Sequence, residues 1–174
     1  MKIAIAGRMA SGKTTLAKAL AEHWDGEILS LGGKVKEVGK DLFGMVEKDR
    51  PLLQQIGMKM REIRPDVWIE YLDREATKRT CVVVDDCRFV NEARWFKDNG
   101  WLLVRLNIEE EVQKVRLQKT YPDDWEQHWN NRNDPSETQV SEIPSEWIHY
   151  ELAGEQNIAV SDVVDDLMQI LATL

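Results

Sequence analysis

The sequence predicts an α/β fold: a doubly wound parallel sheet flanked by helices. Short apolar segments alternate along the chain with segments whose apolar residues recur at helical spacing, which is typical of parallel sheets covered by helices. The run Cys81–Val84 is continuous, apolar and β-branched, as expected of a strand buried on both faces. A glycine-containing turn, Gly7–Thr14, separates the first strand from the first helix.

The first half of the chain is predicted to contain one strand and four helices. Lys2–Ala6 is a short apolar strand. Leu16, Ala17, Leu20 and Ala21 recur at helical spacing in the first helix. The four helices are expected at about Gly12–Trp24, at Gly32–Phe43 with Gly44 closing it, at Pro51–Ile63, and after Arg64 with Pro65 in the first turn.

The second half is predicted to add the remaining strands and helices. Thr120–Pro135 lacks clear periodicity, so we expect a loop or mobile insertion there. Ser161 is the expected N-cap of the last helix. The other elements are strands at Cys81–Val84, Trp101–Leu106 and Trp147–Leu152, and helices at Val90–Asn99 (stopping at Gly100), Glu109–Lys119 and Ser161–Leu171.

Length and composition indicate one compact domain. The 174 residues are 43% hydrophobic and 31% charged, which is ordinary for a soluble globular protein. The apolar runs are too short to cross a bilayer, and the N-terminus lacks the features of a signal peptide. Cys81 and Cys87 show neither metal-ligand spacing nor a disulfide framework. We therefore expect a cytoplasmic protein with no membrane partner.

The net charge of −8 argues against an extended nucleic-acid surface, because such a surface is normally basic. It does not exclude a nucleotide, since one phosphate pocket needs only a few basic residues. A small-molecule nucleotide is thus a better expectation than a nucleic acid. The oligomeric state stays open, with a homodimer as one alternative.

Residues Gly7–Thr14 match the pattern G-x-x-x-x-G-K-S/T in full. Gly7 and Gly12 allow a tight turn whose N–H groups converge on an anion, and the following helix adds its N-terminal dipole. The pattern predicts a phosphate loop for ATP, with Lys13 reaching the β- and γ-phosphates and Thr14 ligating Mg²⁺. The expected ATP-binding residues are Gly7, Arg8, Ala10, Ser11, Gly12, Lys13, Thr14 and Thr15.

Two acids, Asp85 and Asp86, follow the apolar run Val82–Val84. The carboxyl ends of strands in an open parallel sheet face the ligand crevice. At least one of these acids is therefore expected to contribute to the Mg²⁺ site beside the phosphate loop, either directly or through water. Which of the two lies closer to the metal is left open.

The segment Asp86–Glu92 reads D-x-R-F-x-N-E, and it resembles the bacteriophage-type deoxynucleoside monophosphate kinases of the adenylate-kinase-like group. The resemblance implies that Asp86 lies near Mg²⁺ and that Arg88 binds the acceptor or the transferring phosphate. A planar guanidinium suits that role. It also implies catalytic roles for Lys13, Asp86 and Arg88, and location in the host cytoplasm if a phage encodes the chain.

The same resemblance assigns the helical segment 31–79 to the acceptor. Arg50–Gly57 looks like the R-x-L-L-Q-x-x-G signature of this group. Arg50 is therefore the first candidate for the acceptor phosphate, and Gln54 or Gln55 for the base or sugar. The remaining acceptor candidates are Lys36, Arg61, Trp68 and Arg88.

A lid is implied at about residues 116–137, with Arg116, Lys119 and Arg132 as candidates for contacting ATP. Asn133–Glu137 resembles the H-P-S-E motif of the group, but Asp134 stands where histidine is usual. The chain would then be a single P-loop kinase domain over 1–174. Its core would span 1–30, 80–119 and 145–174.

The activity expected from these observations is transfer of the ATP γ-phosphate to a nucleoside or deoxynucleoside monophosphate. One alternative is a P-loop kinase with another acceptor, such as a modified base in DNA or dephospho-coenzyme A. A second is a nucleotide-dependent switch. The N-K-x-D motif usual in guanine-binding switches is absent, and the D-x-x-G match at Asp41–Gly44 lies inside a helical pattern.

Overall fold

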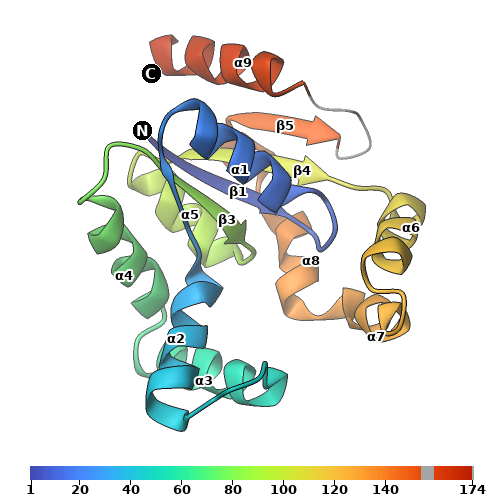
Figure 1. Cartoon of the computed structure of the whole chain (residues 1–174). Coiled ribbons are helices and arrows are strands. Elements are labelled where there is room, and N and C mark those ends of the chain that lie inside the picture. Colours follow the sequence, from blue (N-terminus) through green and yellow to red (C-terminus); the bar gives the residue numbers. More distant parts are fainter. Residues whose placement is uncertain (154–158, 174) are drawn as a thin grey trace.

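Five parallel strands form one sheet in the order β2-β3-β1-β4-β5 (Figure 1). The computed structural model describes residues 1–153 and 159–173, without the Arg50 side chain. From β1 the chain winds first to one side of the sheet, through β2 and β3, and then to the other, through β4 and β5. This confirms the predicted doubly wound fold. The strands are β1 (Lys2–Gly7), β2 (Glu27–Leu29), β3 (Val82–Cys87), β4 (Leu102–Asn107) and β5 (Tyr150–Ala153).

Helices cover both faces of this sheet (Figure 1). In the described part of the chain, α1 and α9 pack on one face, and α4 and α5 pack on the other. The α-helices are α1 (Lys13–His23), α2 (Leu31–Phe43), α3 (Arg50–Ile63), α4 (Val67–Ala76), α5 (Val90–Asp98), α6 (Glu110–Thr120), α7 (Trp125–Asn130), α8 (Pro135–Glu142) and α9 (Val160–Thr173). Two short 3-10 helices are η1 (Asn131–Asn133) and η2 (Ser145–Trp147).

The alternation of side chains along β1 divides the core in two. Ile3 and Ile5 point into the cluster formed with α1 and α9, whereas Ala4 and Ala6 point into the cluster on the opposite face. All four side chains are fully buried. Because both faces of β1 are covered, a continuous apolar sequence is required there. That requirement is what made this strand recognisable.

The structure corrects the prediction of a loop at Thr120–Pro135. Residues Trp125–Asn130 form α7, and η1 follows directly. This six-residue helix has no apolar stripe of its own, and contacts to α6 stabilise it. The Lys114 ammonium lies 5.8 Å from the ring centroids of both Trp125 and Trp129. The rings of Tyr121 and His128 also stack, with their centroids 4.0 Å apart. These tertiary contacts leave no periodic signal in the sequence.

Two predicted helix starts are also displaced. Pro65 lies before α4 and not in its first turn, because Asp66 is the N-cap and the helix begins at Val67. The last helix begins at Val160, so Ser161 lies inside it and is not its N-cap. The last strand begins at Tyr150, because Ser145–Trp147 forms η2.

Two further elements, β2 and α8, were not predicted. The strand β2 has only three residues and pairs with β3 alone, so its sequence carries almost no pattern. The start of α8 is easier to recognise in retrospect. Asp134 caps it by accepting a hydrogen bond from the Ser136 N–H at 2.9 Å, and Pro135 opens the first turn. An acid followed by proline is a common helix start.

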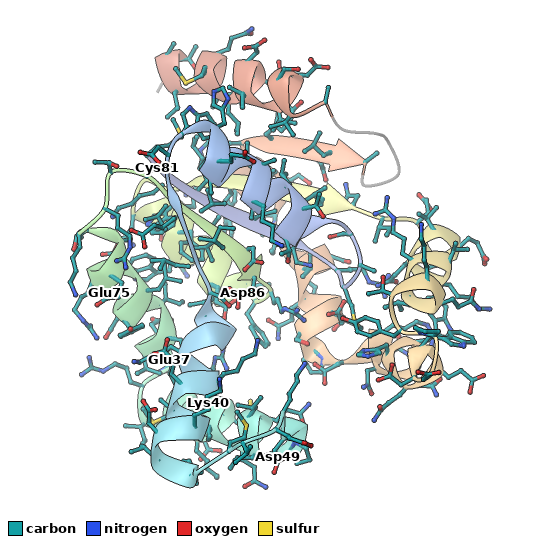
Figure 2. The ribbon with its side chains drawn as sticks, viewed as in Figure 1. Glu37, Lys40, Asp49, Glu75, Cys81 and Asp86 are labelled. Atoms are coloured by element: carbon teal, nitrogen blue, oxygen red, sulfur yellow. The ribbon has the colours of Figure 1, made fainter. Side chains whose placement is uncertain are left out.

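The carboxyl ends of the strands carry the segments that matter for function. The helices α2 and α3 extend beyond one side of this edge, and α6 and α7 stand beyond the other (Figure 1). Asp86 lies at the end of β3, next to the start of α2 (Figure 2). A crevice at this edge is the usual ligand site of open α/β sheets.

We predict that Phe96→Ala lowers the free energy of unfolding by about 3–5 kcal/mol, because it opens a cavity in the core. Phe96 is fully buried, and its ring centroid lies 4.8 Å from that of Trp101. Denaturant unfolding followed by circular dichroism measures the effect. The matched control is Val115→Ala, at a side chain that is 61% exposed, and it should change the value by less than about 0.5 kcal/mol. Equal losses in both variants would contradict this packing.

Candidate phosphate-transfer site

A cleft of about 1430 Å³ opens at the carboxyl ends of β1 and β3. It brings together most of the residues that the sequence assigned to ATP, metal and acceptor. The predicted residues that line it are Ala10, Ser11, Gly12, Lys13, Thr14, Thr15, Lys36, Gln54, Arg61, Asp85, Asp86, Arg88, Arg116 and Lys119.

The loop between β1 and α1 has the conformation of a phosphate loop. Gly12 has a φ of 102° and Ala10 a φ of 62°, so the backbone turns through the left-handed region twice. A Cβ atom on Gly7 would lie 2.7 Å from Ser11 Oγ and 2.8 Å from the Leu106 carbonyl oxygen. A side chain at position 7 would therefore displace either the loop or β4.

The start of α1 is left open to a ligand. Gly12, its N-cap, provides no side-chain cap, and the first turn contains no acid. The N–H groups of a first helical turn have no partner within the helix. They can therefore donate to an anion in the cleft, and the helix dipole favours negative charge at this position.

Lys13 is buried inside this loop. Its Nζ donates to the Arg8 carbonyl oxygen at 2.7 Å, and only 7% of the residue is exposed. Burial, helped by the positive charge of Arg88, lowers the pKa of Lys13 to about 8, and the carboxylates of Glu137 and Asp85 oppose this shift. The ammonium is thus poorly solvated and close to the position of a bound phosphate.

Two residues outside the motif hold the loop at Met9. The Met9 N–H donates to Glu137 Oε2 at 2.6 Å, and Gln113 Nε2 donates to the Met9 carbonyl oxygen at 2.9 Å. Glu137 is 2% exposed and Gln113 is fully buried. Neither was among the predicted site residues. The sequence does mark Glu137, because it ends the Asn133–Glu137 segment that resembles the H-P-S-E motif. Nothing distinguishes Gln113 from the other polar residues of α6.

Asp85 is the acid that contacts the proposed metal ligand of the loop. The Thr14 hydroxyl donates to Asp85 Oδ2 at 2.8 Å. These two oxygens fit Mg²⁺, which commonly takes one or two protein ligands and completes its octahedron with phosphate oxygens and water. No group of three or more acidic, histidine or cysteine side chains able to hold a metal occurs in the described part of the chain. Thr14 and Asp85 would thus hold Mg²⁺ only together with a nucleotide.

Asp86 has a different environment. It accepts hydrogen bonds from the Ser30 hydroxyl at 2.7 Å and from the N–H groups of Leu31 at 2.9 Å and Gly32 at 2.8 Å. Ser30 in turn caps α2 by accepting from the Gly33 N–H at 3.0 Å. Asp86 therefore fastens the start of α2 to the end of β3. Of the two acids, the geometry brings Asp85 and not Asp86 to Thr14.

Arg88 lies over the cleft and is held at both ends. Its backbone N–H donates to Glu92 Oε2 at 3.0 Å, and its side-chain Nη1 donates to Glu137 Oε1 at 2.8 Å. The side chain is 36% exposed, against 3% for Glu137. The guanidinium is thus anchored on one side and accessible from the cleft.

A second arginine that lines the cleft, Arg61 of α3, is also held in place. Its Nη2 donates to Glu92 Oε1 at 3.1 Å, and its guanidinium carbon lies 5.0 Å from the Phe89 ring centroid. Burial raises the pKa of Glu92, while the backbone N–H of Arg88 and the charge of Arg61 favour its ionised form. Glu92 therefore supports both arginines of this half of the cleft.

Of two arginines predicted to lie in a lid, Arg116 meets the phosphate loop and Arg132 does not line the cleft. Arg116 Nη1 donates to the carbonyl oxygens of Ala10 at 3.1 Å and Ser11 at 3.3 Å. The Arg132 guanidinium stacks at 4.6 Å from the Trp129 ring centroid. Arg8 points away from the cleft, since its Nη2 donates to the Arg132 carbonyl oxygen at 3.3 Å.

Three acceptor candidates differ in position. Trp68 is 4% exposed, belongs to the core, and donates its Nε1 to the Gly57 carbonyl oxygen at 3.3 Å. Its ring is therefore packed away from the cleft and cannot stack on a base. Lys36 and Gln54 do line the cleft. The Arg50 side chain lies outside the part of the structure that is described.

The fold and the site define a class of protein. A phosphate loop between the central strand and α1, in a parallel sheet of order β2-β3-β1-β4-β5, is the P-loop arrangement found in small kinases. Residues 3–139, more than half of the chain, match the model of a family described as AAA domain. The chain therefore belongs to the AAA domain family. No curated protein sequence matches it.

Solved structures of similar fold cover nearly the whole chain. The shikimate kinase from Acinetobacter baumannii in complex with shikimate is 21% identical, with a TM-score of 0.57 over 99% of this chain and 93% of that one. An uncharacterized protein from Eubacterium ventriosum is 16% identical, with a TM-score of 0.63 over 100% and 99%. A gluconokinase from Sinorhizobium meliloti is 17% identical, with a TM-score of 0.56 over 99% and 91%. At these identities the likeness is one of fold.

Within the described residues, no helix has the length and apolar character needed to span a membrane.

We predict that the two neighbouring acids respond differently to substitution. Asp86→Ala removes the acceptor of three hydrogen bonds at the start of α2 and should lower the free energy of unfolding by about 1–3 kcal/mol. Asp85→Ala removes one bond, which is exposed, and should lower it by at most about 1 kcal/mol. The Asp85 variant should instead lose Mg²⁺-dependent ATP binding. Denaturant unfolding and calorimetric titration separate the two effects, and equal destabilisation would contradict the assignment.

Proposed function

We propose that this protein is an ATP-dependent phosphotransferase that converts a nucleoside or deoxynucleoside monophosphate to the diphosphate. One observation carries the proposal: a phosphate loop and a separate group of basic side chains face the same cleft. The loop contributes Lys13 and Thr14, and the opposite half contributes Lys36, Arg61 and Arg88. Such a cleft suits two phosphorylated molecules bound end to end.

The donor half is built for the terminal phosphates of ATP. The uncapped N–H groups at the start of α1 and the Lys13 ammonium bind them, and Arg116 adjoins the loop from α6. Mg²⁺, held by Thr14 and Asp85 together with the nucleotide, would neutralise charge on the β- and γ-phosphates. The protein groups are in position before binding, so little reorganisation is required at the moment of transfer.

The acceptor half favours a phosphate over a neutral hydroxyl. A hydroxyl acceptor is assisted by a carboxylate that takes its proton, whereas a monophosphate oxygen is already a nucleophile. Of the acids that line the cleft, Asp85 accepts from the Thr14 hydroxyl and Asp134 from the Ser136 N–H, whereas Asp86 and Glu92 each accept three hydrogen bonds from the protein. Neither has an oxygen left without a protein partner. We therefore assign no general base, and transfer depends on alignment and charge neutralisation.

Arg88 is the side chain whose chemistry best suits the phosphate being transferred. Its guanidinium can bind phosphate oxygens bidentately and offset the charge that develops during transfer. Arg61 and Lys36 would hold the acceptor phosphate, and Gln54 would meet its sugar or base. This set of roles follows the family resemblance of the Asp86–Glu92 and Arg50–Gly57 segments, with Arg50 as a further candidate.

A second candidate is a small acceptor of the kind named for the structural neighbours. Those names mention shikimate and gluconate, and the shared fold covers nearly all of each chain. Both compounds combine hydroxyl groups with a carboxylate, and that carboxylate would suit the same basic side chains. The nucleotide hypothesis differs from this second candidate because a monophosphate acceptor needs no group to take up a proton.

A panel assay of ADP release tests the proposal. The acceptors are each ribo- and deoxyribonucleoside monophosphate, shikimate, gluconate and dephospho-coenzyme A, all with Mg²⁺ and ATP. We expect turnover with one or a few monophosphates, at a rate well above the ATP hydrolysis seen without acceptor. Turnover only with a hydroxy acid would replace the monophosphate with the second candidate, and hydrolysis without any acceptor would indicate a switch. The matched control is folded Lys13→Ala, which should lose nearly all activity because the phosphates lose their buried cation.

We predict that Lys36→Ala raises KM for the acceptor by roughly tenfold or more, since a hydrogen bond between charged groups contributes about 1.5–3 kcal/mol. KM for ATP should stay near the parental value, because Lys36 lies on the acceptor half of the cleft. Lys40→Ala, on the same helix but outside the cleft lining, is the control and should change neither constant. A rise in KM for ATP with unchanged acceptor KM would reverse the assignment of the two halves.

A further inference from the structure

Glu137 is a buried acid that touches both halves of the site without lining the cleft. It is the third residue of α8, and its backbone is fixed because its N–H donates to the Asp134 carbonyl oxygen at 2.8 Å. Its side chain is 3% exposed. An ionisable side chain is rarely buried to this degree unless it is paired.

The two carboxylate oxygens of Glu137 have different partners. Oε2 accepts from the Met9 N–H of the phosphate loop at 2.6 Å, and Oε1 accepts from Arg88 Nη1 at 2.8 Å. One rigid carboxylate therefore sets the position of the Arg88 guanidinium relative to the loop that would carry the γ-phosphate. Within the described residues, Glu92 holds the backbone N–H of Arg88 and Glu137 holds its guanidinium.

The positive charges of Lys13 and Arg88 favour an acid at the position of Glu137. Lys13 and Arg88 are both cationic and close enough for the charge of Arg88 to lower the pKa of Lys13, while Glu137 acts in the opposite direction. Glu137, which accepts a hydrogen bond from Arg88, thus offsets the repulsion between the two cations. A charge-assisted hydrogen bond to a buried carboxylate is also strongly oriented, because the carboxylate has no alternative partner in water.

We infer that Glu137 is a positioning residue for phosphoryl transfer, which aligns Arg88 with the phosphate loop and does not itself touch the substrates. This inference rests on the proposed phosphotransfer. It assigns a purpose to the Asn133–Glu137 segment, whose acid lies at the end of the lid-like region 116–137 and in the first turn of α8. The carboxylate links the position of α8 to the alignment of the arginine.

Glu137→Gln tests the inference by removing the charge while retaining the shape and one acceptor oxygen. We expect kcat to fall roughly tenfold to a hundredfold, because misplacing a reacting group by about 1 Å can cost a factor of that size. KM for ATP and for the acceptor should each stay within about threefold, since ground-state contacts remain. Glu142→Gln makes the same change at an exposed position on the same helix and should have parental kinetics.

A double-mutant cycle shows whether Glu137 acts through Arg88. If it does, Glu137→Gln should cause little further loss of kcat in an Arg88→Ala background, because the group that it positions is gone. Losses that multiply, or a parental kcat in Glu137→Gln, would overturn the inference. Should the glutamine variant fail to fold, Glu137→Asp keeps the charge but is one methylene too short to reach both partners. It should show the same selective fall in kcat, and a parental kcat there would also overturn the inference.

The parental protein separates this inference from the proposed function. If it transfers no phosphate to any acceptor in the panel, the proposed function fails and the cycle has no rate to report. If it is active and the glutamine variant is equally active, only the role of Glu137 fails. Thermal unfolding of each variant, with and without MgATP, establishes that the protein compared is folded and still binds nucleotide.

Discussion

The buried ammonium of Lys13, held at 2.7 Å from the Arg8 carbonyl oxygen, is the interaction on which the rest of the site depends. A cation with so little exposure is costly unless anions or dipoles surround it. The carboxylates of Glu137, Asp85 and Asp86 provide the opposing charge. They come from α8 and the end of β3, so α8 has to lie against the carboxyl edge of the sheet beside Lys13.

Each acid around this charge performs a separate task, and the task follows from the element that carries it. Asp85 and Asp86 are neighbours on β3, and side chains of successive strand residues point to opposite sides. One therefore reaches Thr14 and the other reaches the start of α2. Glu92, in the first turn of α5, accepts hydrogen bonds from the Arg88 backbone N–H and the Arg61 side chain. The strand β3 and the helix α5 after it thus connect the proposed donor and acceptor halves of the cleft.

The sequence predicted the sheet and the phosphate loop well, because both depend on local rules. A strand covered on both faces must be apolar throughout, and a loop that wraps phosphate needs glycine where φ is positive, as at Gly12. The β2 strand and α7 were not predicted, since three residues carry no period and α7 depends on contacts from α6. Trp68 shows the same limit: helical spacing was compatible with both a core and a ligand role, and only the tertiary packing of α4 into the core buries it.

The acceptor is the part of the function least accessible to sequence and fold alike. The loop that we propose for the donor depends on backbone N–H groups and one sequence motif, so the sequence alone identifies it. The side chains that we propose for the acceptor come from α2, α3 and the end of β3, and their positions depend on long-range pairs such as Arg61 with Glu92. A change of one such residue alters the acceptor without altering the sheet order. Chains with this fold can therefore differ in acceptor. Every carboxylate oxygen of Asp86 and Glu92 already accepts a hydrogen bond from the protein, and this fact says more about the substrate here than the fold does.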